Sequence, residues 1–466
     1  MKGKRPGMLR DIPGELSRKY YDLLLRNETG GTFWRAVMDD SAKVPVLESQ
    51  DGIYVTDVDG NVYIETLGAF ATSCLGYSPK QLIKVAMEQA ERLMHVSDWP
   101  NIPRAELAQR LLEIAPGFLK HGQVQFELGG GPTVDLALEL MHYASPPPRR
   151  DIITFFGGYH GRTVASVNLA ANAYNREGFP GVNFNVIRVP YAYCYRCAFE
   201  RTYPSCDMFC VTWIERLFES AEYGVYDPNT GTSLVAGLVV EPVQTHSGMI
   251  VPPAEFYQGL RRICDRYGLI FLSDAIPMSI GRSGKWFTCE HFGVTPDMIT
   301  ICKSISGGIW PLSALIARRD IAEAWANRPD KHMGTFHGNP VGCRAALEVI
   351  AEIERRNLLA HVTEVGNYFL DGLKALQAEH EVLADAAGLG LALGVEFVRD
   401  KRTKQPAPEL AARVASEALR RGVILLRVGY FGNRITFMPP YIITKEEIDL
   451  ILEVLDQSIK AAKELA

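Results

Sequence analysis

The sequence predicts an α/β protein with a large, doubly wound, mostly parallel sheet and a smaller α+β domain. Helical and strand-like segments alternate from about residue 80 to residue 330, as they do in parallel sheets covered by helices on both faces. Several strand-like runs end directly in a charged or aromatic residue, and ligands of such sheets bind at the carboxyl ends of strands. With 466 residues, the chain is too long for one simple core, so two or three domains are expected.

The expected elements follow in chain order. The first 60 residues read as an irregular arm and short strands, with a hairpin turning at Asp59-Gly60. Helical periodicity and apolar β-prone runs then predict helices over 81–96, 104–115 and 133–144, and buried strands over 123–128, 151–156, 234–242, 269–275 and 297–303. A helix after Pro340, short strands over 391–398 and 432–440 and a final helix over 446–465 complete the chain.

These elements predict three parts of the chain. They are an N-terminal arm with part of the small domain (1–60), a large domain (61–340) that carries a cysteine-bearing insertion at about 191–212, and a C-terminal small domain (341–466).

Charge and hydropathy exclude some classes of partner. The formal net charge is −5, and no dense basic run suggests nucleic acid as a partner. The longest apolar runs are strand-length, far short of a membrane span. The start, MKGKRPGMLRDIPGEL, lacks the apolar core of a secretory signal, and the nine cysteines are expected to be reduced. We therefore expect a cytoplasmic protein.

Two strand ends carry ionisable side chains in apolar surroundings. Lys303 ends the run MITICK and is followed by small residues, and loss of solvation lowers the pKa of such a lysine, making it a usable nucleophile. Asp274 ends the run LIFLSD, 29 residues earlier, and needs a cation or hydrogen-bond donors there. Taken singly, each also fits a structural role, and Asp274 also fits a metal ligand or the partner of a protonated ring nitrogen.

Two further motifs suit a flat, anionic ligand. Gly129-Gly130-Gly131-Pro132 lies between a strand and a helix, where backbone amides and the helix dipole can bind phosphate. Tyr159 and His160 lie on a glycine-flanked loop after a strand and could stack on a ring. Singly, these motifs fit an ordinary helix-capping turn and a partly buried loop. Together with Lys303 and Asp274, on an α/β scaffold, they predict a pyridoxal phosphate site.

With these motifs in order, the sequence resembles the class III aminotransferases, a branch of the fold-type-I pyridoxal-phosphate enzymes. The likeness runs from about residue 40 to the C-terminus. The stretches that carry it are GGYHGRT, EPVQTHSGMIVPP, LRRICDRYGLIFLSDA, EHFGVTPDMITICKSISGG, GTFHGNPVGCRAAL and RITFMPPYIIT.

The resemblance implies a role for each candidate residue. Lys303 would be the Schiff-base lysine and general acid/base, and Asp274 would partner the pyridine nitrogen. The other cofactor-binding residues would be Tyr159 and His160 at the ring, Ile276 on its other face, Gly130 and Gly131 at the phosphate, Glu241 beneath the cofactor, and Thr335 at the phosphate of the neighbouring subunit of a homodimer. Arg434 would bind a substrate carboxylate, which its bidentate fork suits.

The sequence departs from the family pattern at three places. Pro277 stands where the family has a glutamine that contacts the cofactor's phenolic oxygen, so that contact is lost. The helix opening at 129–133 lacks the family's hydroxyl side chains, so backbone amides must hold the phosphate. His246 replaces a glutamate that usually pairs with the arginine, so we expect Arg434 to stay unpaired and to favour substrates that carry a carboxylate.

The predicted insertion contains a cysteine cluster with the spacing C-x2-C-x8-C-x3-C. Its members, called the insertion cysteines, are Cys194, Cys197, Cys206 and Cys210. Four thiolates at this spacing could bind one zinc ion, although the middle spacing is short for a zinc ribbon. They could equally pack as small apolar side chains or pair into disulfides.

The leading functional prediction is an aminotransferase that moves an amino group between a carboxylate-bearing amino acid or amine and a 2-keto acid. The first alternative is a racemase, epimerase, aminomutase or decarboxylase on the same scaffold. Racemisation needs a second acid near the ring, for which Tyr159, His160 and His246 are candidates. The second alternative is a cofactor-binding protein without turnover. We expect a homodimer with its active site at the subunit interface.

Overall fold

The structure is a computed structural model that describes residue 6 and residues 12–30 and 45–464. The chain forms two compact units. The first comprises 1–80 and 360–466, and the second comprises 81–359. Each unit is described by itself below. The predicted boundaries were 60/61 and 340/341, and the helix that begins at Pro340 packs against a helix of the second unit, which places the later boundary after it.

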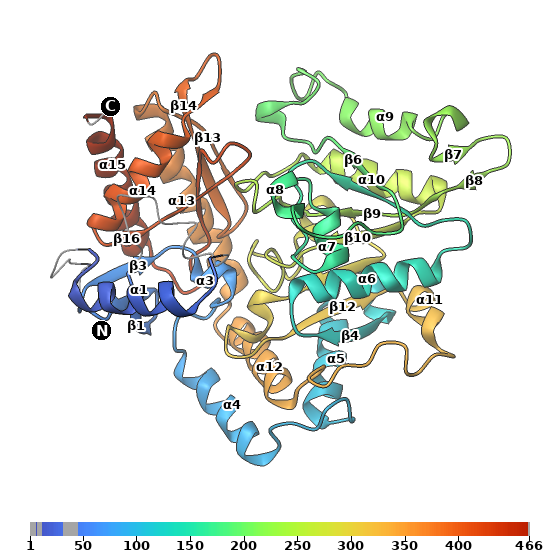
Figure 1. The fold of residues 1–466 in the computed structure, drawn as a ribbon, viewed down its shortest axis with the longest axis horizontal. Coiled ribbons are helices and arrows are strands. Elements are labelled where there is room, and N and C mark those ends of the chain that lie inside the picture. Colours follow the sequence, from blue (N-terminus) through green and yellow to red (C-terminus); the bar gives the residue numbers. More distant parts are fainter. Residues whose placement is uncertain (1–5, 7–11, 31–44, 465–466) are drawn as a thin grey trace. The chain divides into compact units, whose positions relative to one another are not determined.

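The second unit is built on a seven-stranded sheet with the order β4-β12-β11-β10-β9-β5-β6 (Figure 1). Its strands are β4 (Gln123–Glu127), β5 (Asp151–Phe155), β6 (Val186–Val189), β9 (Val235–Val240), β10 (Ile270–Asp274), β11 (Met298–Ile301) and β12 (Ser313–Ala317). β12 runs antiparallel to both of its neighbours, and the other pairs are parallel. The predicted mostly parallel sheet is therefore confirmed.

Helices cover both faces of this sheet, as residue alternation along β10 shows. Ile270 and Leu272 belong to the apolar cluster under α6 (Gly130–Ala144). Between them, Phe271 packs its ring on Tyr257 of α10 (Ala254–Tyr267), with the ring centroids 5.1 Å apart. Since successive strand residues point to opposite faces, α6 and α10 lie on opposite sides of the sheet.

Shorter elements complete the second unit. The helices are α4 (Lys80–Arg92, starting at the boundary), α5 (Ile102–Ile114), α7 (Val164–Leu169), α8 (Ala173–Arg176), α9 (Phe209–Arg216), α11 (Arg319–Ala322) and α12 (Pro340–Arg355). A small hairpin pairs β7 (Tyr226–Asp227) with β8 (Thr232–Ser233). The 3-10 turns are η1 (Gly117–His121), η2 (Cys194–Arg196), η3 (Ala221–Tyr223), η4 (Thr288–Phe292), η5 (Lys303–Ser306) and η6 (Glu323–Trp325).

The first unit is α+β and contains two sheets. One has the order β1-β2-β3-β16, built from β1 (Leu47–Asp51), β2 (Tyr54–Asp57), β3 (Val62–Glu65) and β16 (Val423–Ile424). The other has the order β13-β14-β18-β17, with β15 beside β14, from β13 (Leu383–Gly388), β14 (Leu393–Asp400), β15 (Gln405–Pro406), β17 (Leu426–Val428) and β18 (Arg434–Phe437). The helices are α1 (Glu15–Asn27), α3 (Gly68–Ala71), α13 (Leu358–Glu379), α14 (Pro408–Arg420) and α15 (Lys445–Glu464).

The predicted hairpin at Asp59-Gly60 is confirmed, but the prediction that the chain before it is irregular is wrong in part. Residues 15–27 form α1, whose first turn is capped from a distance. The carboxylate of Asp59 accepts hydrogen bonds from the amides of Leu16 (2.9 Å) and Ser17 (3.0 Å). A cap usually comes from the residue just before the helix, so this one leaves no local signal. Within the described part of the chain, no helix is long and apolar enough to cross a membrane.

Candidate active site

Four neighbouring strands of the seven-stranded sheet end in the predicted site residues. Along the order β11-β10-β9-β5, Lys303 follows β11, Asp274 ends β10, Glu241 follows β9, and Tyr159 with His160 follows β5. All four strands are parallel, so their carboxyl ends share one edge. The sheet order therefore gathers residues that are up to 144 positions apart in sequence, as the prediction required.

Asp274 and His160 form a buried pair. Both side chains are about 2% exposed, and Nδ1 of His160 lies 2.7 Å from Oδ2 of Asp274. Oδ1 of Asp274 accepts hydrogen bonds from Thr300 Oγ1 (2.9 Å) and from the amide of Ile276 (3.3 Å). Burial alone would lower the pKa of His160, but the hydrogen bond and charge of Asp274 raise it above the ordinary value. These contacts therefore hold the Asp274 carboxyl group in a fixed orientation.

Lys303 opens η5 in the left-handed conformation, at φ +54°. This conformation is costly for a residue with a Cβ and turns the chain sharply out of the sheet. Burial lowers the pKa of Lys303 from its ordinary value, and the charge of Arg282 lowers it further, while Glu241 and Asp274 act in the opposite direction. An amine with a lowered pKa is more often neutral and hence nucleophilic.

Glu241 supports the loop that carries Tyr159. Its Oε1 accepts a hydrogen bond from the Tyr159 amide (2.9 Å), and its Oε2 accepts one from the Thr245 amide (3.2 Å). Burial raises the pKa of Glu241 to about 7, and the Asp274 charge adds to this, although His160 opposes it. Glu241 is therefore a positioning group that joins the ends of β9 and β5.

This raised pKa predicts a pH-dependent stability. A group whose pKa is higher in the folded state contributes stability below its unfolded pKa and loses it as the pH rises through the folded one. For Glu241 this window runs from about 4.5 to about 7. The glutamine of Glu241→Gln cannot ionise, so this contribution does not change with pH in the variant. As the pH rises through the window, we therefore expect the urea midpoint of wild type to fall relative to that of Glu241→Gln. A difference that stays constant with pH would contradict an ionising buried carboxyl.

His246 lies beside Tyr159. The two rings stack with their centroids 4.9 Å apart and their planes at 28°. The surrounding protein, and then the positive charges of Arg162 and Lys303, lower the pKa of His246. His246 is thus a neutral imidazole at neutral pH, within electrostatic range of the Lys303 amine.

The glycine turn before α6 forms a tight cradle. A Cβ on Gly131 would lie 3.1 Å from Thr163 Oγ1, and a Cβ on Gly161 would lie 2.5 Å from the Gly131 Cα. Pro132 has no N–H, and the Thr133 amide already donates to the Gly129 carbonyl (3.0 Å), so the donors at this helix start are the Gly131 amide and the Gly130 amide, which also contacts Cys302. Two amides at the N-terminus of a 15-residue helix suit a phosphate.

The Lys303 segment and Ile276 both approach this cradle. The backbone amides of Lys303 and Gly130 hydrogen-bond to Cys302, which opposes the rise in the pKa of Cys302 caused by burial. Ile276 Cδ1 lies 3.0 Å from where a Gly130 Cβ would stand. The structure thus brings Lys303, the glycine turn and Ile276 together, while Thr335 lies exposed before α12.

The prediction that Arg434 stays unpaired is wrong. Arg434, on β18 of the first unit, is about 1% exposed. Its Nη1 lies 2.6 Å from Oδ2 of Asp385 and 3.0 Å from Oε2 of Glu396. Glu396 faces Arg434 across the β14–β18 pair, where directly opposite residues interact. The absence of the family's glutamate therefore does not free this arginine.

Two residues of the site were missed at the sequence level. Thr300 fixes Asp274 from the neighbouring strand, where the two residues are directly in register. Arg282 is fully buried and lowers the pKa of Lys303. The stretch SIGRSGKW, with a lone arginine shortly after Asp274, was the available signal for Arg282. Thr300 gave none, because its partner depends on strand register.

The donor set fits pyridoxal phosphate. A buried carboxylate, backed by His160, can hold a protonated pyridine nitrogen, and two helix-start amides can hold the phosphate. The Lys303 amine, with its lowered pKa, can bond to the aldehyde carbon. No group in this set conflicts with the cofactor.

Comparisons with known proteins show the family and the fold of the chain. A family model described as aminotransferase class-III matches residues 37–459. The chain is 34% identical to a leucine/methionine racemase of Thermococcus litoralis, over 88% of this chain and 89% of that protein. It is 33% identical to an adenosylmethionine-8-amino-7-oxononanoate aminotransferase of Geobacter sulfurreducens, over 90% and 93%. A transaminase structure from a marine Virgibacillus matches with a TM-score of 0.86 and 26% identity, over 96% of this chain and 100% of that one.

Proposed function

The chain belongs to the class III aminotransferases, pyridoxal-phosphate enzymes of fold type I, and we propose that Lys303 and Asp274 carry its reaction. The reaction moves an amino group between an amino acid or amine and a 2-keto acid. The observation that supports this assignment of residues is the meeting of Lys303, Asp274, Glu241 and Tyr159 at the ends of four adjacent strands.

When bound, pyridoxal phosphate supplies an electron sink for the carbanion formed at the substrate's α-carbon. The Lys303 amine would hold the cofactor at its aldehyde carbon and would also move the α-proton of the substrate, as general base and then as general acid. Asp274 keeps the ring nitrogen protonated, and His160 and Thr300 hold the orientation of its carboxylate. Gly130 and Gly131 hold the phosphate through their amides.

Tyr159 and Ile276 limit the position of the ring. Tyr159 stacks on His246, and this contact fixes the orientation of the tyrosine ring. Ile276 packs beside Gly130, next to the phosphate cradle. A fixed ring position also fixes the angle between the substrate's Cα–H bond and the cofactor ring. That angle decides which bond at the α-carbon breaks.

We also propose that Arg434 acts as a gated carboxylate binder. Its guanidinium is shared with Asp385, whose side chain is 21% exposed, and with fully buried Glu396. A substrate carboxylate could replace Asp385 without leaving Glu396 unpaired. This favours amino acids over simple amines as donors.

The proposed assembly is a cytoplasmic homodimer in which Thr335 reaches the phosphate of the neighbouring subunit. The exposed position of Thr335, just before α12, is compatible with this role. A sedimentation mass of one chain for the cofactor-loaded protein would contradict it.

Racemisation of an amino acid is the second candidate function. Two observations favour it: the similarity to the leucine/methionine racemase, and the position of His246 beside Tyr159 within electrostatic range of Lys303. Racemisation needs one group on each face of the ring. With His160 held by Asp274, His246 is the better candidate for the second group.

The test uses the cofactor-loaded protein and a panel of L-amino acids without keto acid. Transamination produces about one equivalent of keto acid per site and then stops, because the cofactor retains the amino group. Racemisation produces D-amino acid continuously and no keto acid. Neither product from any donor would contradict both functions and support a cofactor-binding protein without turnover.

The His246→Asn variant separates the two functions further. If His246 is the second acid/base, we expect racemisation to fall by about 10²-fold or more, with keto acid formation changed far less. Chiral chromatography and a keto acid assay on the same sample measure both rates. Exposed His121, on η1, provides the control in His121→Asn, which should change neither rate. Equal losses in both rates of the His246 variant would contradict this role.

A further inference from the structure

The insertion cysteines occupy two tight turns. Cys194 opens η2 and Cys197 follows it, and the Glu200 amide then donates to the Cys197 carbonyl (3.0 Å). Cys206 and Cys210 flank a second turn, in which the Phe209 amide donates to the Cys206 carbonyl (3.1 Å) and α9 begins. Each turn therefore presents a pair of thiols, as the C-x2-C and C-x3-C spacings allow.

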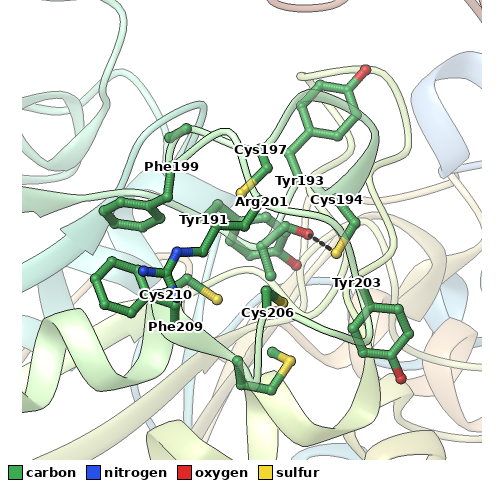
Figure 2. Close-up of a pocket in the computed structure, with 13 residues that line it drawn as sticks. Tyr191, Tyr193, Cys194, Cys197, Phe199, Arg201, Tyr203, Cys206, Phe209 and Cys210 are labelled. Carbon is green, nitrogen blue, oxygen red and sulfur yellow. Dashed lines mark hydrogen bonds between the residues drawn. The ribbon is translucent and has the colours of Figure 1, made fainter.

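The four thiols line one small cavity. Its volume is about 20 Å³, which is close to that of a single water-sized sphere. Figure 2 shows the four cysteines around the pocket, with the rings of Phe199 and Phe209 to the left of them, and Tyr191 also lines the cavity. A cavity of this size, with sulfur on several sides and aromatic walls, matches one ion better than an organic ligand.

The four insertion cysteines are thiols, not disulfides. All four sulfur atoms are therefore available as ligands once their protons pass to solvent.

Cationic side chains lie beside the cavity. The Arg201 guanidinium lines it and sits 3.7 Å from the centroid of the Phe209 ring, and Arg216 lies 5.4 Å from the same ring. Four thiolates and one divalent ion carry a net charge of −2. The two arginines would partly balance that charge, a role that a cage of neutral thiols would not require.

The closest groupings of ligand atoms within the described residues lie elsewhere. They are Glu127 with His332 and His337, and Glu379 with His380 and Asp456. Ion pairs among these residues, such as His380 to Asp456 at 2.7 Å, account for their proximity. The insertion sulfurs are more widely spaced, so an ion would have to draw them inward across the cavity.

We propose that the insertion cysteines bind one zinc ion as four thiolate ligands. Soft sulfur ligands in a tetrahedral set select zinc over magnesium or calcium, and four protein ligands without an open position indicate a structural role. On binding, four Zn–S bonds replace bonds from zinc to water, and the four thiol protons pass to solvent. No change of oxidation state is involved.

The site would order the insertion and, through Tyr191, brace the end of β9. The Tyr191 hydroxyl donates to the carbonyls of Glu241 and Pro242, each at 3.2 Å, and its ring packs on Phe155 and Phe256. Zinc loss should therefore loosen the insertion while leaving the seven-stranded sheet folded.

The experiment measures metal content of the cofactor-loaded protein by mass spectrometry of dialysed samples. We expect about one zinc per chain in wild type and in the control Cys74→Ala, and a loss of at least about tenfold in Cys194→Ser/Cys206→Ser. Cys74 is fully buried in the other unit, so the control removes a thiol but keeps the insertion cysteines. Circular dichroism confirms that the double variant is folded.

Cobalt provides a test that does not depend on a variant. Protein refolded or produced with Co²⁺ should show the intense thiolate charge-transfer and visible bands of a tetrahedral Co–S₄ centre. Three results would overturn the proposal: no stoichiometric metal together with four insertion thiols that react with a thiol reagent in the native protein, iron in place of zinc, or disulfides among these cysteines in the intact mass.

Discussion

Lys303→Ala is expected to reduce turnover by about 10³-fold or more, because it removes both the covalent attachment of the cofactor and the group that moves the α-proton. The variant should still bind pyridoxal phosphate through Asp274 and the Gly130–Gly131 amides, but without the visible absorbance of a lysine-bound cofactor. Lys303→Arg keeps a positive charge and should lose activity to a similar extent. Absorbance spectra and steady-state rates with the preferred donor measure these effects.

A matched control for this prediction is Lys285→Ala. Lys285 is an exposed lysine of the same unit, and its Nζ contacts only the Glu290 carbonyl among the bonds described, at 3.3 Å. Its loss should leave both the spectrum and the rate close to wild type. If Lys303→Ala retained more than about a tenth of the wild-type rate, or kept the lysine-bound spectrum, another amine would have to perform this chemistry.

Arg434→Ala is expected to destabilise the protein by about 3 to 5 kcal/mol, because it leaves a buried carboxylate without its cation. Glu396 is about 1% exposed, and Asn433 is its other side-chain donor, at 3.2 Å. This effect on stability is separate from any effect on substrate binding. A thermal or urea unfolding series on the cofactor-loaded protein measures it.

Two variants distinguish this mechanism from a general loss of packing. Arg427→Ala removes an exposed arginine from neighbouring β17 and should change stability by less than about 0.5 kcal/mol. Arg434→Met/Glu396→Leu removes both buried charges together and should recover much of the lost stability. If the double variant is as unstable as Arg434→Ala, the unpaired carboxylate is not the cause.

Much of the fold was accessible from local patterns. The runs at 151–156, 234–242, 269–275 and 297–303 became β5, β9, β10 and β11, because continuous apolar β-prone residues between helices have few other solutions in an α/β chain. The hairpin at Asp59-Gly60 was equally local. Helix α1 was missed because Asp59, more than 40 positions away, caps it.

For the active site, the residue types and their places at strand ends were fixed by the sequence itself. Lys303, Asp274 and the glycine turn could be chosen because a charge or a run of glycines at the end of an apolar strand is unusual. Which of them meet was decided by strand order, since β10 lies beside β11 and β9 lies beside β5. Sheet order depends on long-range packing that no short window contains.

The pairing of charges was decided by tertiary structure alone. Arg434 and His246 could be singled out from the sequence. The sequence did not show that carboxylates pair with Arg434, or that Tyr159 stacks on His246. Glu396 reaches Arg434 through strand register, and His160 reaches Asp274 across the sheet's edge. A chain's local pattern determines which elements form and which groups they carry. Contact between those groups depends on how the elements pack, because electrostatic and hydrogen-bond energies act over only a few ångströms.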